Sequence, residues 1–285
     1  MSAPVFLAEP GDLDGLRPGD VFWLRGSEAR HAAVVQRRAA GERVDVVDTA
    51  GVRLVGTVRE VGTVREIGAK DDAGRQTGAE RPGRARPSLP AGPAERDAVA
   101  VDVVRVVREP TPQPALVLVQ ALAKGDRDER AVEAATEVGV DRVVPWQAHR
   151  SVVVWRGQRA AKSRALWQGT VRAAAKQSRR SWVPPVAEVV DLGGLTALVA
   201  ATRADGGVVL VLDADGPLPV ADAPLPASGE VVVVVGPEGG IAQPELDALT
   251  GAGALVVRLG PHVLRTSTAG PVALALLAQR LDRWT

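Results

Sequence analysis

The chain has 285 residues and contains neither cysteine nor tyrosine. Without cysteine it can form no disulfide, no thiolate metal site and no cysteine nucleophile. Its histidines, His31, His149 and His262, lie far apart and lack the spacing of metal ligands. The sequence therefore predicts a protein of a reducing compartment that binds no metal.

Hydrophobic segments that target or anchor a chain are also missing. The first residues, MSAPVFLAEPGDLDG, have no basic start followed by an apolar run, so we expect no signal peptide. No apolar run approaches the length that a transmembrane helix needs. Hydrophobic residues make up 46% of the chain, which is enough to bury a large core. We therefore expect a cytoplasmic protein without membrane contact.

Charge is distributed unevenly, although the net charge is only +1. Residues 142–180 contain ten basic side chains and no acidic one. A basic block in a nearly neutral chain indicates a local surface for a polyanion. Four tryptophans lie in or beside this segment: Trp146, Trp155, Trp167 and Trp182. We expect at least two of them, Trp167 included, to pack in the core, and the others can stack on bases.

The first part of the chain is rich in short β-branched runs between residues 18 and 67. One helix is expected at 27–40, with Ser27 as its cap and Gly41 at its end. Residues 68–97 are rich in Gly, Pro, Ala and charge, so we interpret them as a disordered insertion. The proline-rich residues 109–114 separate the expected domains, 1–110 and 111–285.

Strands and helices alternate in the second part of the chain. Strands are expected at 116–120, 142–145, 208–213, 231–235 and 254–259, and helices at 126–138, 158–178, from Pro244, and at 269–283. Such alternation predicts an α/β fold with a mostly parallel sheet covered by helices.

Two loops carry the chemistry, because ligands of open α/β sheets bind beyond the carboxyl ends of strands. The first follows strand 231–235 and consists of Gly236, Pro237, Glu238, Gly239 and Gly240. It matches neither a dinucleotide fingerprint nor a phosphate loop. Its glycines let a ligand approach the main chain, and Glu238 either faces that ligand or orients the loop. The alternative is a plain turn in which Glu238 favours a helix dipole.

The second loop follows strand 254–259 and leads into the last helix. An arginine among small residues at a sheet end, Arg265, is either exposed or held by a partner. One of Thr266, Ser267 and Thr268 is expected to cap the helix. The loop residues expected to bind a ligand are Leu259, Gly260, His262, Val263, Leu264 and Thr266.

The two loops, in this order and near the carboxyl end, resemble those of SPOUT-class methyltransferases. Further motifs narrow the match: ALAKGD at 121–126, ATEVGV at 135–140, HRSVV at 149–153 and AKQSRR at 175–180. The set resembles the bacterial 16S ribosomal RNA uracil-N3 methyltransferase family, over nearly the whole chain except 68–97. Three positions depart from the family pattern: Ser267 replaces a common glutamate, His262 a basic residue, and Ala173 a common acidic residue.

The resemblance implies a carboxy-terminal SPOUT α/β trefoil-knot domain, preceded by a small PUA-like β-barrel that helps to bind RNA. It implies S-adenosylmethionine held by the two loops, a homodimer, and 16S ribosomal RNA of the small subunit as substrate. Arg265 is the first candidate for stabilising an anionic uracil, and Arg150 is the second. Glu137 is a candidate proton acceptor, the alternative being a solvated helix residue. The expected RNA-binding residues are Lys124, Arg150, Arg172, Lys176, Gln177, Arg179 and Arg180.

Two other functions stay open at this point. A SPOUT enzyme that methylates a ribose 2′-hydroxyl would use the same loop chemistry. A non-catalytic RNA-binding or ribosome-assembly factor could keep the basic segment after losing the cofactor, and the serine at 267 leaves that alternative open. Intact loops at 236–240 and 264–266 favour the enzyme.

Overall fold

The computed structural model describes residues 3–62 and 98–284. The chain forms two compact units, which divide between Glu109 and Pro110. The insertion predicted at 68–97 lies outside the described residues. Among the described residues, no helix is both long enough and apolar enough to span a bilayer.

The first unit is built on a five-stranded sheet in the order β1-β3-β4-β5-β2. Its strands are β1 (Val5–Leu7), β2 (Val21–Arg25), β3 (Arg43–Val47), β4 (Val52–Gly62) and β5 (Ala98–Arg108). Pairing is antiparallel except between β1 and β3. The long strands β4 and β5 change register twice, and such bulges bend a sheet. Phe6, Leu24, Leu54 and Val101 are among the core residues that this sheet buries.

The helix expected at 27–40 is shorter than predicted. Helix α1 (Gly26–Arg30) continues as one π-helical turn, η1 (His31–Val35). Its first flanking residue is Arg25, so Ser27 does not cap it. Arg37 has a left-handed backbone, with φ of 51°, and this ends the helix before Gly41.

The second unit contains six strands, all parallel, in the order β7-β6-β10-β8-β11-β9. They are β6 (Ala115–Ala121), β7 (Arg142–Trp146), β8 (Val208–Leu212), β9 (Leu218–Pro219), β10 (Glu230–Val235) and β11 (Leu255–Arg258). Five of them lie where the sequence predicts strands. The prediction of an α/β fold with a parallel sheet is therefore confirmed.

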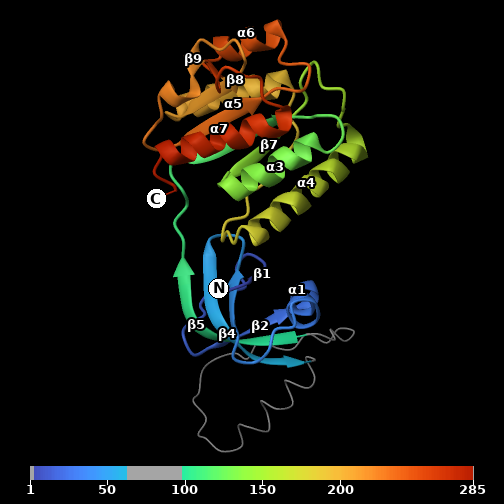
Figure 1. Ribbon diagram of the computed structural model, residues 1–285, viewed down its shortest axis with the longest axis vertical. Helices are drawn as coiled ribbons and strands as arrows, with labels where there is room; N and C mark the ends of the chain where they lie inside the picture. Colours follow the sequence, from blue (N-terminus) through green and yellow to red (C-terminus); the bar gives the residue numbers. More distant parts are fainter. Residues whose placement is uncertain (1–2, 63–97, 285) are drawn as a thin grey trace, which may run out of the picture. The chain divides into compact units, whose positions relative to one another are not determined.

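Helices cover both faces of this sheet (Figure 1). Helices α3 (Arg127–Val138), α4 (Gly157–Gln177) and α7 (Thr266–Arg280) bury residues against one face. Helices α5 (Leu192–Ala204) and α6 (Gln243–Gly251) pack on the other face. A 3-10 turn, η2 (Val220–Asp222), follows β9. Because the six strands are parallel, they all end at one edge of the sheet, and the loops that follow them can form a site there.

Some local predictions hold and others do not. Gly139 ends α3 with φ of 108°, as expected. Trp146, Trp155 and Trp167 are all buried, which confirms the core assignment of Trp167. Helix α7 begins at Thr266, three residues earlier than predicted. Its first flanking residue is Arg265, without a side-chain cap, so the expected capping role of Thr266, Ser267 or Thr268 is wrong.

Candidate active site

The loops that follow β10 and β11 meet at the carboxyl edge of the parallel sheet. They line a cavity of about 630 Å³, a size typical of small-molecule sites. The structure thereby brings together most of the predicted ligand-binding residues: Gly236, Pro237, Glu238, Gly240, Leu259, Gly260, His262, Val263, Leu264 and Thr266, together with Arg265. Gly239 does not line the cavity, although it lies in the same loop.

Several residues of the cavity wall were not predicted from the sequence. Leu212 ends β8, and Asp213 and Ala214 follow it, so the strand-end rule that found the other loops could have found them. Val235, Ile241 and Ala269 add apolar surface. Arg127, in the first turn of α3, also lines the cavity, and no sequence pattern marks it.

Close packing explains why glycine occupies the start of the first loop. A Cβ added to Gly236 would lie 2.7 Å from Cγ1 of Ile241, which is closer than side chains pack. Gly240 has φ of 73°, a conformation that glycine adopts without strain. Its N–H donates to the carbonyl of Pro237 at 2.9 Å, which closes a tight turn. The main chain of this loop therefore faces the cavity with little side chain in between.

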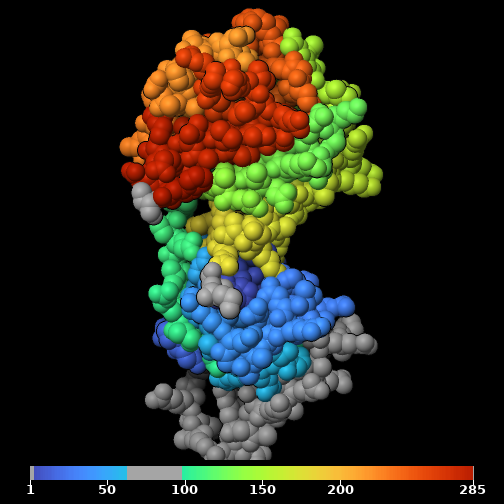
Figure 2. Space-filling view, in the orientation of Figure 1, coloured from blue at the N-terminus to red at the C-terminus, as the bar shows by residue number. Residues whose placement is uncertain are grey.

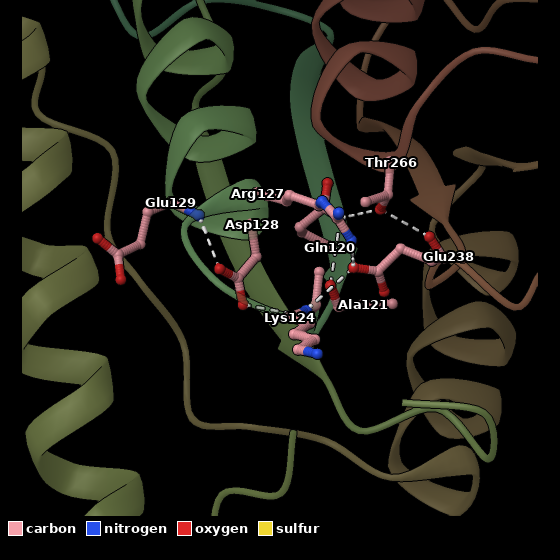
Figure 3. A network of polar contacts seen from close by, with 10 residues as sticks. Gln120, Ala121, Lys124, Arg127, Asp128, Glu129, Glu238 and Thr266 are labelled. Carbon is pink, nitrogen blue, oxygen red and sulfur yellow. Dashed lines mark hydrogen bonds and ion pairs between the residues drawn. The ribbon is translucent and has the colours of Figure 1, made fainter. Parts of the chain in front are cut away.

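Glu238 connects this loop to the loop that follows β6 (Figure 3). Its carboxylate accepts the N–H of Lys124 at 3.1 Å and forms an ion pair with Arg127. Burial raises the pKa of Glu238, but hydrogen bonds from its own N–H, from Arg127 and from Lys124 outweigh burial, and the net pKa is lowered. Glu238 therefore stays ionised and orients the loop, one of the two roles expected from the sequence.

The segment before α3 is held by a second carboxylate (Figure 3). Asp128 is buried and accepts the N–H groups of Ala123 at 3.1 Å and Glu129 at 2.9 Å. Burial raises the pKa of Asp128, while those two hydrogen bonds act in the lowering direction, and the net pKa is raised. This carboxyl fixes the turn that presents Lys124 and Arg127 to Glu238.

Arg150 contacts the main chain of the glycine loop. It donates from Nη1 to the carbonyl oxygen of Gly239 at 2.8 Å. Nearby, the buried carboxylate of Glu245 accepts the N–H of His149 at 2.8 Å and that of Ala242 at 3.0 Å. Arg150 and Glu245 thus join the loop after β7 to the loop after β10.

The two other candidate catalytic residues lie in different surroundings. Arg265 lines the cavity and is exposed, and its guanidinium has no hydrogen-bond or ion-pair partner among residues 3–62 and 98–284. Glu137 is exposed on α3, ten positions beyond Arg127, and does not line the cavity. Ten helical residues span about 15 Å, so the position of Glu137 gives no support for a proton acceptor in this cavity.

The predicted RNA-binding residues are spread over α4 and its end. Arg172 and Lys176 are half-buried on α4, whereas Gln177 and Arg179 are exposed, as is Lys124. Arg180 differs from them, because its side chain is only 14% exposed. Its guanidinium donates to the carbonyl of Thr136 at 2.8 Å and lies 3.5 Å from Asp141. Its location therefore argues for a structural role and against a phosphate contact.

The described residues contain no group of three or more His, Asp or Glu side chains arranged to hold a metal ion. The charged groups of the cavity wall are Arg127, Asp213, Glu238 and Arg265, and His262 adds a polar ring. Both signs of charge are present beside apolar surface, which suits a ligand with polar and apolar parts.

Comparisons with known proteins agree with this arrangement. Residues 109–278 match the model of the RNA methyltransferase domain family. The ribosomal RNA small subunit methyltransferase E of Mycobacterium bovis is 39% identical over 266 residues, or 93% of this chain and 89% of that protein. The protein of the same name from Bacillus subtilis is 32% identical over 193 residues, or 66% of this chain and 75% of that protein.

Structural similarity extends over both units. A crystal structure of a ribosomal RNA small subunit methyltransferase E from Neisseria gonorrhoeae, bound to S-adenosyl methionine, has a TM-score of 0.74. It is 23% identical, and the match covers 98% of each chain. Together with the domain match, this likeness confirms the predicted fold class, a SPOUT domain with a parallel sheet, preceded in the chain by a curled half-barrel sheet where a small PUA-like β-barrel is predicted. From the domain match, and from 39% identity across nearly its whole length, the chain belongs to the ribosomal RNA small subunit methyltransferase E family.

Proposed function

We propose that the protein transfers a methyl group from S-adenosylmethionine to N3 of a uridine in 16S ribosomal RNA of the small subunit. One observation carries this proposal: a cavity between two strand-end loops holds an arginine, Arg265, without a partner in the described chain. The family of the chain indicates RNA methylation, and the cavity supplies a place for it.

The cavity wall fits the cofactor. Leu212, Val235, Ile241 and Leu259 offer apolar surface for an adenine ring, and the glycine loop offers main-chain hydrogen-bonding groups. The carboxyl groups of Glu238 and Asp213 suit a ligand that carries positive charge. We assign Gly236, Pro237, Glu238, Gly240, Leu259, Gly260, Val263, Leu264 and Thr266 to the cofactor, with His262 at the exposed rim. When bound, S-adenosylmethionine supplies the methyl group as an electrophile.

The residues of the chain contribute positioning and charge. N3 of uracil gives up its weakly acidic proton to solvent water, and its lone pair forms the bond to the methyl carbon as the carbon–sulfur bond breaks and leaves its electron pair on sulfur. The negative charge that develops on the uracil is stabilised by the guanidinium of Arg265. This guanidinium is available for that role because no carboxylate of the described chain pairs with it. Alignment of the reacting atoms by the loops contributes further to the rate.

The basic segment supports an RNA-binding role. Arg156, Arg159 and Lys162 are exposed at the start of α4, and Lys124, Gln177 and Arg179 are exposed elsewhere in the same unit. We assign the arginines and lysines among these residues to RNA phosphates and the amide of Gln177 to hydrogen bonding with RNA, with Arg172 and Lys176 as half-buried neighbours. Such contacts give an affinity that falls steeply with salt. The sheet of the first unit is assigned a supporting role in RNA binding.

A homodimer is also part of the proposal. Val272 and Leu276 are exposed on the outer face of α7, 36% and 41% respectively, and Val263 of the second loop is 83% exposed. Figure 2 shows α7, in red, at the surface of its unit. Apolar side chains one helical turn apart on an open face favour burial against a second copy. Sedimentation equilibrium should give a dimer, and Leu276→Glu should give a monomer.

Nucleoside mass spectrometry tests the reaction directly. Small-subunit ribosomal RNA from cells without the gene should lack 3-methyluridine, and purified protein with S-adenosylmethionine should restore it on assembled subunits. Loss of a 2′-O-methyl nucleoside would point instead to the ribose methyltransferase. A protein with no measurable affinity for S-adenosylmethionine would support the non-catalytic binding factor.

A further inference from the structure

Gln120 is the only polar residue of strand β6, whose sequence is ALVLVQA. Its side chain is fully buried, with 0% exposure. A buried amide costs free energy unless it is hydrogen bonded, so its presence needs a physical reason. Gln120 is the register partner of Val235 on β10, the residue immediately before Gly236. It therefore lies beside the residue that leads into the glycine loop.

Hydrogen bonds connect Gln120 to both loops of the cavity (Figure 3). Its Nε2 donates to Oγ1 of Thr266 at 3.0 Å and to the carbonyl of Ala121 at 3.2 Å. The hydroxyl of Thr266 donates in turn to the carbonyl of Gly236 at 2.8 Å. Thr266 begins α7 at the end of the second loop, and Gly236 starts the first loop, so the side chains of Gln120 and Thr266 together connect β6 to both loops.

These hydrogen bonds run from Gln120 through Thr266 to Gly236, and we call the three residues the relay. The direction of its hydrogen bonds follows from the number of hydrogens available. The hydroxyl of Thr266 has a single hydrogen, and the carbonyl of Gly236 can only accept. Thr266 must therefore accept from Gln120, and so must the carbonyl of Ala121. Both acceptors need a donor, and the only donor of the Gln120 side chain is its amide nitrogen, so the amide has one orientation. Its Oε1 has no partner in the described part of the chain, so the two Nε2 bonds alone stabilise it.

Tight packing behind the relay leaves its members little freedom. A Cβ added to Gly270, one turn after Thr266, would lie 2.9 Å from Leu118 and 3.3 Å from Val235. The start of α7 is thus pressed against β6 and β10. Thr266 is only 7% exposed, so bulk water competes little with these partners.

We propose that Gln120 is a positioning residue for the cofactor: through the hydroxyl of Thr266 it fixes the carbonyl of Gly236 and holds the two loops in one arrangement. This inference rests on the proposed use of S-adenosylmethionine. Gln120 does not line the cavity and acts only through Thr266.

Isothermal titration calorimetry with S-adenosylmethionine tests the relay. Gln120→Met keeps the length of the side chain and removes the amide, and should raise the Kd about tenfold, the equivalent of one hydrogen bond. Thr266→Val should raise it by a similar factor. Thr266→Ser keeps the hydroxyl and should restore binding, which a role in packing alone would not predict. Thr136→Val is the matched control, since Thr136 is buried and its hydroxyl donates only to the carbonyl of Val132 within α3; its Kd should equal that of the wild type.

A double-mutant cycle identifies the relay as one unit. Gln120→Met combined with Thr266→Val should bind no more weakly than the weaker single variant, because either change breaks the same chain of bonds. A Kd that rises by the product of the two single effects overturns the inference. So does an unchanged Kd in Gln120→Met. If Gln120→Met does not fold, as judged by thermal unfolding, Thr266→Val and Thr266→Ser still test the relay.

The proposed function and this inference fail in different ways. Wild-type protein that shows no heat of binding with S-adenosylmethionine overturns both. Wild-type protein that binds, together with a Gln120→Met variant that binds equally well, overturns only the role of Gln120.

Discussion

Nη1 of Arg150 lies 2.8 Å from the carbonyl oxygen of Gly239 and donates a hydrogen bond to it. The same side chain packs on the glycine, since a Cβ added there would lie 3.3 Å from Cβ of Arg150. From the sequence, Arg150 is the second candidate for stabilising an anionic uracil. Its geometry instead indicates a residue that holds the glycine loop from outside.

Arg150→Ala should therefore raise the KM for S-adenosylmethionine more than it lowers kcat. Loss of a charge-assisted hydrogen bond corresponds to about 1.5–3 kcal/mol, or roughly a factor of ten to a hundred. Steady-state kinetics with saturating RNA measures both constants. Arg159→Ala, an exposed cation of the same basic segment, is the control and should leave the Kd for the cofactor unchanged. A fall in kcat alone would return Arg150 to the catalytic candidates.

Gly236→Ala should abolish cofactor binding. The new methyl group would meet Cγ1 of Ile241 at 2.7 Å, which forces either the loop or Ile241, both of which line the cavity, to move. Gly169→Ala is a matched change in α4, where an added Cβ meets nothing within 4 Å. It should stabilise the protein by up to about 1 kcal/mol through helix propensity. Calorimetric titration and thermal unfolding of both variants check this contrast, and normal binding by Gly236→Ala contradicts it.

Glu238 should contribute stability that acid removes. Its pKa is lowered in the folded chain, so the contribution is present above the ordinary value of 4.5 and is lost as the pH falls through the folded pKa. Because the ion pair with Arg127 is partly exposed, we expect less than about 1 kcal/mol. Thermal unfolding of Glu238→Gln should differ from the wild type at neutral pH, and the difference should shrink in acid. Glu133→Gln, an exposed glutamate on α3, should show no such trend.

The sequence predicts the position of the site better than its supporting contacts. Loops at 236–240 and 259–266 each follow a strand, and parallel strands end at one edge of the sheet, so their meeting could be anticipated. Gln120 and Arg127 reach partners 146 and 111 residues away. No local pattern encodes such a distance. Their roles become visible only when β6 and α3 are placed beside the loops.

Helix propensity and the charge of neighbouring residues do not predict two features of the structure, helix α5 and the ion pair of Arg180. Helix α5 contains Gly193 and Gly194, which lower helix propensity, and it forms because Asp191 accepts the N–H of Gly194 and Leu195 packs in the core. Arg180 belongs to a basic run that indicates RNA binding, yet Asp141, just before that run, lies beside it in the fold. A charge count along the chain cannot separate paired cations from free ones.

Arg159 and Lys162 are exposed cations for which no partner exists in the described chain, so they provide a cleaner test of the RNA surface than Arg180. Replacing both by alanine should weaken RNA binding and reduce the slope of log K against log salt by about 1.4, or roughly 0.7 for each phosphate of single-stranded RNA that is no longer neutralised. Fluorescence anisotropy with a small-subunit RNA fragment measures the slope. Arg180→Ala should instead lower the melting temperature, because it leaves Asp141 with one partner fewer. An unchanged slope in the double variant would place the RNA surface elsewhere.

Arg265→Ala should reduce kcat at least a hundredfold, the usual effect of removing one group that stabilises developing charge. The Kd for S-adenosylmethionine should stay near that of the wild type, because the guanidinium makes no contact that shapes the described loops. Arg265→Lys keeps the charge but loses the planar fork, and should recover only part of the activity. Single-turnover methylation of assembled small subunits separates this chemical step from product release. If Arg265→Ala keeps the wild-type rate, the anion must be stabilised by another cation of the cavity wall, and Arg127 is then the group to replace, since it too lines the cavity.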